Sequence, residues 1–193
     1  MTCLGLTGGI GSGKTVVARV FEILNYPVYY TDFEAKRIMQ DSMIVKEKLV
    51  DFFGDEIYIA NQLNKPLLAK LIFNNNDNLH FVNSVVHPEV TKDFLLWKDK
   101  QNDKKISIIE SAILFESGLN NLVDITVAVT APLEVRINRT IIRDNASREA
   151  IIERINNQIS EEKRTELADH VIINDDVQAL LPQINQILSS LNS

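Results

Sequence analysis

The stretch GLTGGIGSGKT, residues 5–15, constrains this chain more than any other, because it holds five of the seven glycines in the sequence. Glycine costs conformational entropy on folding unless the native backbone needs a positive φ or the close approach of another group. Within the stretch, Gly8, Gly13, Lys14 and Thr15 match the spacing G-x-x-x-x-G-K-[ST] of a P-loop. We therefore interpret the stretch as a phosphate-binding loop.

Each part of this motif has a physical role at a bound nucleoside triphosphate. Glycines let backbone N–H groups turn inward around phosphate oxygens, and the start of the following helix adds a favourable dipole. We expect Lys14 to reach the β- and γ-phosphates and the Thr15 hydroxyl to join the coordination of Mg²⁺. The predicted nucleotide-binding residues of the loop are Gly9, Ile10, Gly11, Ser12, Gly13, Lys14 and Thr15. The alternative, a glycine-rich turn of no function, is disfavoured because a predicted strand precedes the motif and a predicted helix follows it.

Composition limits the classes of protein and partner. The chain of 193 residues has a net charge of -6 and a pI of about 5.1, which disfavours a broad nucleic-acid surface, since such a surface needs many Lys and Arg. Cys3 is the only cysteine, so no internal disulfide or zinc cluster is expected. No stretch approaches the roughly 18 apolar residues of a membrane span, and no secretory leader is recognised. We expect a cytoplasmic protein, a monomer or weak homo-oligomer, that binds neither nucleic acid nor membrane.

Short apolar runs alternate with helical patterns along the chain. Continuously apolar runs are typical of strands that are covered on both faces, as in a parallel sheet. The expected strands are residues 2–7, 26–31, 106–109, 124–129 and 170–173. The sequence therefore predicts an α/β fold with a three-layer, doubly wound parallel sheet of five strands, which gathers ligands at the carboxyl ends of the strands.

Two regions exceed what a minimal five-stranded sheet requires, and we expect both to be insertions above this edge. Residues 32–103 are helical in pattern, with turns expected at Asn61–Pro66 and Asn74–Asn78. Residues 139–166 have the pattern of a polar helical hairpin. We expect the first region to bind an acceptor and the second to close as a lid. The predicted core domain comprises the remaining residues, 1–31, 104–138 and 167–193.

The chain has the features of a small phosphotransferase. It lacks the guanine-reading Asn-Lys-x-Asp segment of a GTPase and is short for a large ATPase motor. Asp32 is the leading candidate to contact the acceptor, because it follows the second predicted strand and lies at a helix start where Thr31 and Glu34 have capping-box spacing. Phosphoryl transfer needs positioning more than proton abstraction, so an ionised carboxylate there can orient a hydroxyl. The alternative is a helix-start acid without a catalytic role.

Three further residues are weaker candidates. Glu110 ends the run 106–109, where a carboxylate would face the magnesium directly or through water; a strand-end acid in solvent is the alternative. Glu116 follows a few residues later. His87 precedes Pro88 near the predicted start of a helix, where the residue before proline is pushed out of helical geometry, and alone it is more typical of a structural role.

Six of the eight arginines fall between residues 136 and 164 of an otherwise acidic chain. Arg136, Arg139 and Arg143 are spaced i, i+3, i+7, so we expect them on one helix face. Guanidinium groups match phosphate oxygens and can stabilise the charge of a transferring phosphoryl group. The alternative is a solvated helix whose arginines pair with Glu and Asp.

The order of these motifs resembles the dephospho-CoA kinase family along nearly the full chain. The matching segments are GLTGGIGSGKT (5–15), the helix start at Asp32, VNSVVHP (82–88), ILFESGL (113–119), VD (123–124), NRTIIRD (138–144), ERINNQ (153–158) and ADHVIIN (168–174). The resemblance implies a P-loop kinase fold and ATP-dependent phosphorylation of the ribose 3′-hydroxyl of dephospho-CoA. The products would be CoA and ADP, in the last step of CoA synthesis.

The same resemblance implies roles for particular residues. Asp32 would face the hydroxyl, the region 32–103 would hold dephospho-CoA, and the lid would bring Arg143 near the ATP phosphates or the adenine. The implied site residues are the catalytic Lys14, Asp32 and Arg143, the ATP-binding Arg143 and Asn174, the substrate-binding Asp32, His87, Glu116 and Arg139, and the Mg²⁺-binding Thr15 and Glu110.

The chain departs from the family pattern in two places. Members often read Asp-x-Asp where this chain has Tyr30, Thr31 and Asp32, so only Asp32 can carry the acidic role. They also commonly read Pro-Leu-Leu where this chain has Ala112–Leu114. Neither change removes a phosphate-handling group. Two other functions remain open from the sequence: a kinase for another hydroxyl acceptor, and a nucleotide sensor without catalysis.

Overall fold

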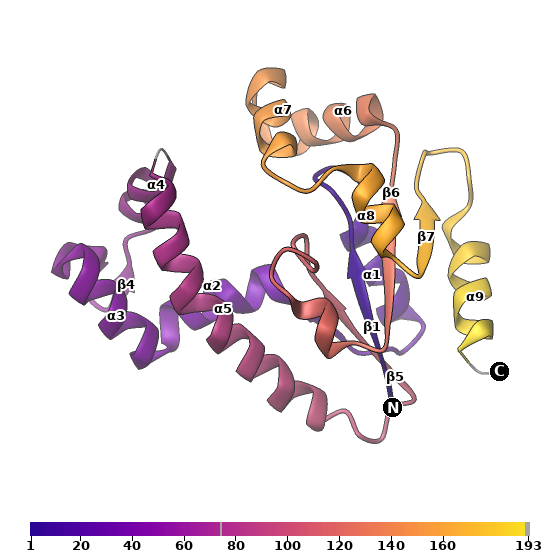
Figure 1. The fold of residues 1–193 in the computed structure, drawn as a ribbon, viewed down its shortest axis with the longest axis horizontal. Helices are drawn as coiled ribbons and strands as arrows, with labels where there is room; N and C mark the ends of the chain where they lie inside the picture. Colours follow the sequence, from indigo (N-terminus) through magenta and orange to yellow (C-terminus); the bar gives the residue numbers. More distant parts are fainter. Residues whose placement is uncertain (74, 192–193) are drawn as a thin grey trace. The chain divides into compact units, whose positions relative to one another are not determined.

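The computed structural model describes residues 1–73 and 75–191. Contacts divide the chain into two compact units, one made of Met1–Tyr30 and the chain from Lys100 onward, the other of Thr31–Asp99. The first unit contains a parallel sheet with flanking helices, and the second is mainly helical (Figure 1). These units are defined by contacts and not by function, so the division into core, acceptor region and lid stays a prediction.

The sheet of the first unit has five parallel strands in the order β2-β5-β1-β6-β7, which confirms the predicted sheet. The strands are β1 (Thr2–Thr7), β2 (Val28–Tyr30), β5 (Ile106–Glu110), β6 (Ile125–Thr130) and β7 (His170–Ile173). The next strands of the sheet in the sequence, β2 and β5, lie on one side of the central β1, and the last two, β6 and β7, lie on the other. The carboxyl end of β1 is therefore a topological switch point, the place where ligands bind in open α/β sheets.

Opposite faces of β1 are covered by different parts of the chain. Leu4 and Leu6 point to one face and are buried in a core with helix α1 (Lys14–Ile23). Gly5 lies on the other face, where a Cβ atom would come within 2.8 Å of the Leu114 side chain. Because both faces are covered, the interior of β1 between Thr2 and Thr7 carries no polar side chain, as its sequence indicated.

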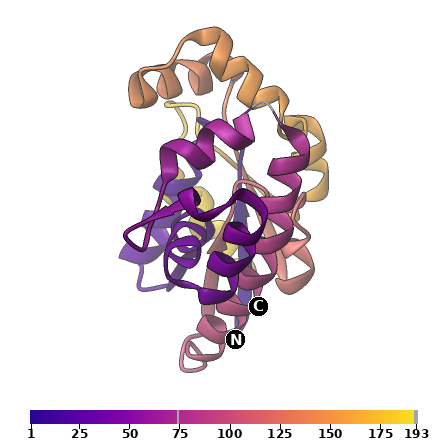
Figure 2. The ribbon, with the colours of Figure 1, turned by 90° about the vertical axis from the view of Figure 1, so that its left-hand side faces the viewer.

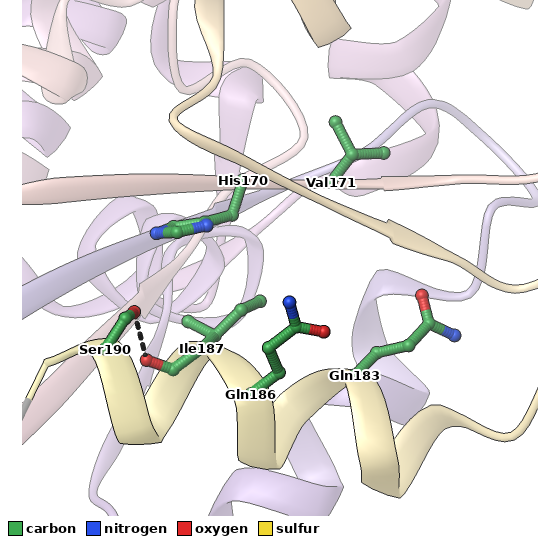
Figure 3. A pocket seen from close by; sticks show the side chains of 6 residues that line it. All are labelled: His170, Val171, Gln183, Gln186, Ile187 and Ser190. Carbon is green, nitrogen blue, oxygen red and sulfur yellow. Dashed lines mark hydrogen bonds between the residues drawn. The ribbon is translucent and has the colours of Figure 1, made fainter.

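Strand β7 forms one edge of the sheet and lies beside helix α9 (Leu180–Ser190). The Gln183 carboxamide on α9 accepts a hydrogen bond from the Ile173 N–H at 2.8 Å and donates one to the Ile173 carbonyl at 2.9 Å. Gln183 thus occupies the position that a further strand would take at Ile173. It also lines a small pocket between β7 and α9 (Figure 3), with His170, Val171, Gln186, Ile187 and Ser190.

The region predicted as a helical hairpin contains parts of three helices of the first unit: α6 (Leu133–Asp144), α7 (Arg148–Asn156) and α8 (Glu161–Leu167). Ser147 and Ser160 cap the second and third of these helices, each accepting a hydrogen bond from the backbone N–H three residues later. The hairpin prediction therefore missed one helix break. The predicted boundary between residues 138 and 139 lies inside α6.

The described residues of the second unit form helices and a small antiparallel hairpin (Figure 2). Along the chain they are α2 (Thr31–Asp41), α3 (Met43–Phe53), the 3-10 helix η1 (Asp55–Ile57), β3 (Tyr58–Ile59), β4 (Gln62–Leu63), α4 (Lys65–Phe73) and α5 (Asn76–Asp99). The β3–β4 hairpin was not predicted. Its turn residues Ala60 and Asn61 have φ of 48° and 64°, as a two-residue hairpin loop requires. Of these two residues, only the asparagine is of a type that favours such values.

Helix α5 begins earlier than predicted. The turn expected at Asn74–Asn78 is wrong where the structure describes it, because α5 starts at Asn76; Asn74 lies outside the described residues. The Asn75 side chain caps the helix by accepting a hydrogen bond from the Asn78 N–H at 3.0 Å. Asparagine is a strong helix cap, so the run that suggested a turn starts a helix.

The expectation for His87 and Pro88 is also wrong, because both lie inside α5 rather than near its start. The helix buries apolar side chains before and after the proline, and this packing outweighs the local preference of the residue before proline for extended backbone. These side chains are Val82, Val85, Val86, Val90 and Phe94. Although α5 has 24 residues, neither it nor any other helix in the described ranges is long and apolar enough to cross a membrane.

Candidate active site

The glycine loop joins the end of β1 to the start of α1, at the centre of the carboxyl edge of the sheet. Gly11 and Gly13 have φ of 78° and 88°, in the left-handed region that favours glycine. A Cβ atom on Gly11 would lie 2.2 Å from the Arg136 carbonyl oxygen, and one on Gly13 would lie 2.1 Å from the Asn174 side-chain nitrogen. Backbone conformation and close packing therefore both require glycine at these two positions.

The loop has donors to offer a ligand. In the part of the chain that the structure describes, the backbone N–H groups of Gly11 and Gly13 make no hydrogen bond, and the buried Ser12 hydroxyl has no partner. Unpaired N–H groups beside the first turn of a helix are an anion-binding arrangement, because each N–H is a donor and the helix dipole adds positive potential. The residues present thus fit a nucleotide phosphate.

Ile10, in the middle of the loop, is held on both sides by side chains from beyond β6. The Arg136 Nε atom donates to the Ile10 carbonyl at 3.0 Å, and the Ile10 N–H donates to Gln158 Oε1 at 3.0 Å. Arg136 belongs to α6, and Gln158 to the connection between α7 and α8. Reasoning from the sequence gave Gln158 no role, although it ends the segment ERINNQ (153–158) that resembles the family.

Arg139 and Asn174 contact carbonyl groups of the loop. The Asn174 Nδ2 atom donates to the Ser12 carbonyl at 2.8 Å. The Arg139 Nη1 atom lies 3.4 Å from the Gly11 carbonyl oxygen, and the same guanidinium pairs with Asp176. Both side chains therefore brace the loop in this structure. The substrate-binding role of Arg139 and the ATP-binding role of Asn174 stay predictions.

A buried charge cluster also supports the loop. Glu161 Oε2 lies 2.8 Å from Arg136 Nη1 and 2.8 Å from Arg164 Nη1, and the two arginine side chains are only 5% and 1% exposed. Burial lowers the pKa of Arg136, which Glu161 partly counters, and a guanidinium stays charged in proteins. Two arginines that share one carboxylate leave one net positive charge. This charge lies beside Gly9, because a Cβ atom added at Gly9 would be 2.3 Å from Arg136 Nη2.

Lys14 and Glu110 bring the loop and the end of β5 together. The Lys14 Nζ atom lies 2.8 Å from Glu110 Oε1, and the Glu110 side chain is 3% exposed. Glu110 therefore differs from the strand-end acid in solvent that the sequence left open. Within the described residues, no group of three or more His, Cys, Asp or Glu is placed to hold a metal ion. Magnesium bound at nucleotide phosphates needs only one or two protein oxygens, which Thr15 and Glu110 can supply.

Tyr30, at the end of β2, occupies the position where the resembling family often has an acid. It is paired in register with Glu110 on β5. Burial and a hydrogen bond to Glu22 raise the pKa of Tyr30, so its phenol stays protonated. The side chain is thus a neutral hydrogen-bond donor to Glu22 rather than a second acid.

Arg143 and Glu116 have other partners in this structure. Arg143 is exposed near the end of α6, where its Nε atom donates to Asp144 at 2.7 Å. Glu116 Oε1 accepts a hydrogen bond from the Ile159 N–H at 3.3 Å. As far as the chain is described, neither side chain bonds to the glycine loop. Their predicted roles at ATP and substrate stay predictions.

Asp32 and His87 belong to the second unit. Asp32 is exposed in the first turn of α2, as predicted, and the helix begins at Thr31, directly after β2. His87 is half-buried in α5, and burial lowers the pKa of its imidazole. The side chain is therefore neutral at pH 7.

The family model and the sequence relatives show one family for this chain. A family model described as dephospho-CoA kinase matches residues 2–179. A dephospho-CoA kinase of Bacteroides fragilis is 42% identical over 188 residues, which span 97% of this chain and 92% of the relative. A crystal structure from Thermus thermophilus matches with a TM-score of 0.82 and 31% identity, over 98% of this chain and 95% of that chain. A dephospho-CoA kinase from Campylobacter jejuni shares the fold, with a TM-score of 0.69, 21% identity and coverage of 98% and 95%.

Proposed function

Because this chain belongs to the dephospho-CoA kinase family, and so is a kinase that phosphorylates dephospho-CoA with ATP, we propose which of its residues carry the reaction. The group transferred is the γ-phosphoryl of ATP, and the acceptor is the ribose 3′-hydroxyl of dephospho-CoA. The products are CoA and ADP. The family assignment answers the choice of acceptor that the sequence motifs alone left open.

The observation that best supports this proposal is the glycine loop. Its Gly11 and Gly13 N–H groups have no partner among the described residues, and the ammonium of Lys14 lies beside a buried carboxylate. The N–H groups receive phosphate oxygens. Lys14 exchanges Glu110 for the β- and γ-phosphates, because a polyphosphate brings several negative charges into reach of the same ammonium. The loop then holds the transferring group in place.

Thr15 and Glu110 are the proposed protein groups for Mg²⁺. A hydroxyl and a carboxylate are hard oxygen donors, the kind that this ion prefers, and Glu110 loses its partner when Lys14 turns to the phosphates. When bound, Mg²⁺ neutralises charge on the β- and γ-phosphates. Thr15 places its hydroxyl at the second residue of α1, next to Lys14.

Asp32 is the proposed residue that orients the acceptor hydroxyl. It follows β2 with only Thr31 between, and β2 ends at the edge of the sheet at which the glycine loop lies. Phosphoryl transfer passes through a loose transition state, so a carboxylate that aligns the hydroxyl suffices. No second acid assists at Tyr30, where the phenol is neutral and bonded to Glu22.

The remaining site residues are proposed to bind either the substrate or ATP. We assign His87, Glu116 and Arg139 to substrate binding, and Arg143 and Asn174 to ATP binding, on the family resemblance alone. Residues 32–103 are proposed to hold dephospho-CoA, and residues 139–166 to act as the lid. A cytoplasmic site of action and a monomeric or weakly oligomeric state also stay predictions.

The direct test mixes the protein with ATP, Mg²⁺ and dephospho-CoA and quantifies CoA and ADP by chromatography. We expect equal amounts of CoA and ADP, with little ADP when dephospho-CoA is omitted. The Lys14→Ala variant is the negative control. ADP without CoA would show another acceptor or uncoupled hydrolysis, and ATP binding without any product would favour a sensor.

A further inference from the structure

Gln158 is a polar side chain at the glycine loop for which the proposed mechanism has no use. Its Oε1 atom accepts the Ile10 N–H at 3.0 Å, and its own backbone N–H donates to the Ile155 carbonyl at 3.1 Å. The side chain therefore spans from the end of α7 to the middle of the loop. It is fixed at its base by the helix end and at its tip by the loop.

The backbone around Gln158 is held as well. The next residue, Ile159, donates its N–H to Glu116 at 3.3 Å, and its carbonyl accepts from Arg164 Nη2 at 3.2 Å. Arg164 is itself 1% exposed and paired with Glu161. These hydrogen bonds hold the connection between α7 and α8 in place, so Gln158 faces the loop in a defined orientation.

The orientation of the carboxamide follows from its partner. The Ile10 N–H can only donate, so the atom that faces it must be the oxygen and not the nitrogen. The two donors of Nε2 then project from the same planar group beside the loop. Among the described residues, Nε2 has no hydrogen-bond acceptor. Phosphate oxygens are acceptors only, and a loop that binds phosphate brings them next to Ile10.

We propose that Gln158 Nε2 donates a hydrogen bond to an oxygen of the transferring phosphoryl group of ATP, while Oε1 stays on Ile10. This inference rests on the proposed function, since it requires the triphosphate to lie in the glycine loop. A donor held before the reaction costs no reorganisation when charge shifts in the transition state. Gln158 is thus a neutral phosphate-contacting residue that adds to the charges of Lys14 and Mg²⁺.

Two substitutions separate the two ends of the carboxamide. Gln158→Glu keeps an oxygen for the Ile10 N–H but replaces the donors with a negatively charged acceptor. Gln158→Met keeps a similar length and adds no charge, but it lacks both the donors and the oxygen that accepts the Ile10 N–H. We expect kcat to fall about 100- to 1,000-fold in Gln158→Met, as for the loss of one preorganised donor, and further in Gln158→Glu because a carboxylate repels the phosphoryl oxygens.

The measurements are kcat and KM for CoA formation, the Kd of ADP, and thermal unfolding of each variant. ADP lacks the transferring group, so its Kd should change less than about twofold in Gln158→Met. Gln186→Ala, an exposed glutamine of α9, is the matched control and should behave as the wild type. The unfolding data identify any variant whose kcat falls because it is unfolded.

Two results would overturn the assignment. Near-normal kcat in Gln158→Glu with impaired Gln158→Met would show that only the bond to Ile10 matters. Near-normal kcat in both would show that the side chain has no role in turnover. Failure of the proposed function is distinguishable from either result, because the wild-type protein would then produce no CoA in the same assay.

Discussion

Lys14 and Glu110 form an ion pair, Nζ to Oε1 at 2.8 Å, where the glycine loop meets the end of β5. The carboxylate is almost fully buried, so it depends on the lysine for compensation of its charge. A ligand that draws the lysine away therefore also changes the surroundings of Glu110. Stability and activity are coupled through this pair, and substitutions can separate them.

We expect Lys14→Ala to reduce turnover by at least about 1,000-fold and to destabilise the nucleotide-free protein by about 3 kcal/mol, because a buried carboxylate loses its partner. The double variant Lys14→Ala, Glu110→Gln should regain most of that stability and none of the activity. Urea unfolding followed by a CoA assay measures both. A double variant no more stable than Lys14→Ala would contradict the idea that the lone charge causes the loss.

Asp32→Asn should lower kcat about 100-fold and leave the Kd of ATP within about twofold, because the residue acts on the acceptor and not on the nucleotide. Asp51→Asn, at an exposed position of α3, is the control and should retain wild-type kcat. Steady-state kinetics with dephospho-CoA, together with ATP titration, separates the two effects. An Asp32→Asn enzyme with near-normal kcat would remove Asp32 from the mechanism.

Two glycines with a left-handed backbone, Gly13 in the glycine loop and Gly118 outside it, separate the cost of a positive φ from the cost of a steric clash. Gly118→Ala should cost about 1 kcal/mol from its φ of 74° alone, since the nearest described atom beyond the adjacent residues, Asn121 Nδ2, lies 3.7 Å from the added carbon. Gly13→Ala adds a clash with Asn174 at 2.1 Å to a similar φ, so we expect a cost of about 3 kcal/mol and loss of ATP binding. Unfolding curves and nucleotide titrations check both. Equal costs would mean that the Asn174 side chain yields to the new methyl group.

Asp169 gives the protein a defined sensitivity to acid. Its Oδ2 accepts the Thr126 N–H and hydroxyl, each at 2.8 Å, and these bonds hold the pKa of Asp169 below its ordinary value of 3.8. A group with a lowered native pKa stabilises the fold above its unfolded value and loses that contribution as pH falls through the native value. We expect Asp169→Asn to be less stable than the wild type at pH 7, with the difference shrinking below about pH 4.

Denaturation of the wild type and of Asp169→Asn at pH 7, 5, 4 and 3 follows this difference. The Asp51→Asn variant serves again as the control, because its carboxylate is exposed. A gap between wild type and Asp169→Asn that stays constant with pH would mean that ionisation of Asp169 contributes nothing.

The parts of the fold that follow from local sequence were predictable. The glycine loop, the strand before it and the helix after it are specified within a few adjacent residues, and the five strands of the sheet match short apolar runs of the sequence. Asp32 at the start of α2 followed from the same reasoning. In each case the signal and the structure occupy the same short stretch of chain.

Features that depend on distant contacts were not predictable in this way. Pro88 reads as a helix boundary, yet the valines packed on both sides keep α5 continuous. Arg136 and Gln158 both hold Ile10, although 126 and 148 positions separate them from it. Spacing along α6 correctly groups its arginines on one helix but does not show that Arg136 is buried against the loop while Arg143 bonds to Asp144 in solvent.

The amide of Gln183 has a consequence for self-association. An open sheet can recruit a strand from another molecule wherever an edge offers unpaired backbone groups, and this is a common start of aggregation. At β7 both groups of Ile173 are already bonded to Gln183, and the opposite edge, β2, is only three residues long. A second chain that tried to extend the sheet would have to break two bonds at one edge or settle for a very short ladder at the other. Growth of the sheet is thus opposed at Ile173 on one edge and limited by strand length on the other.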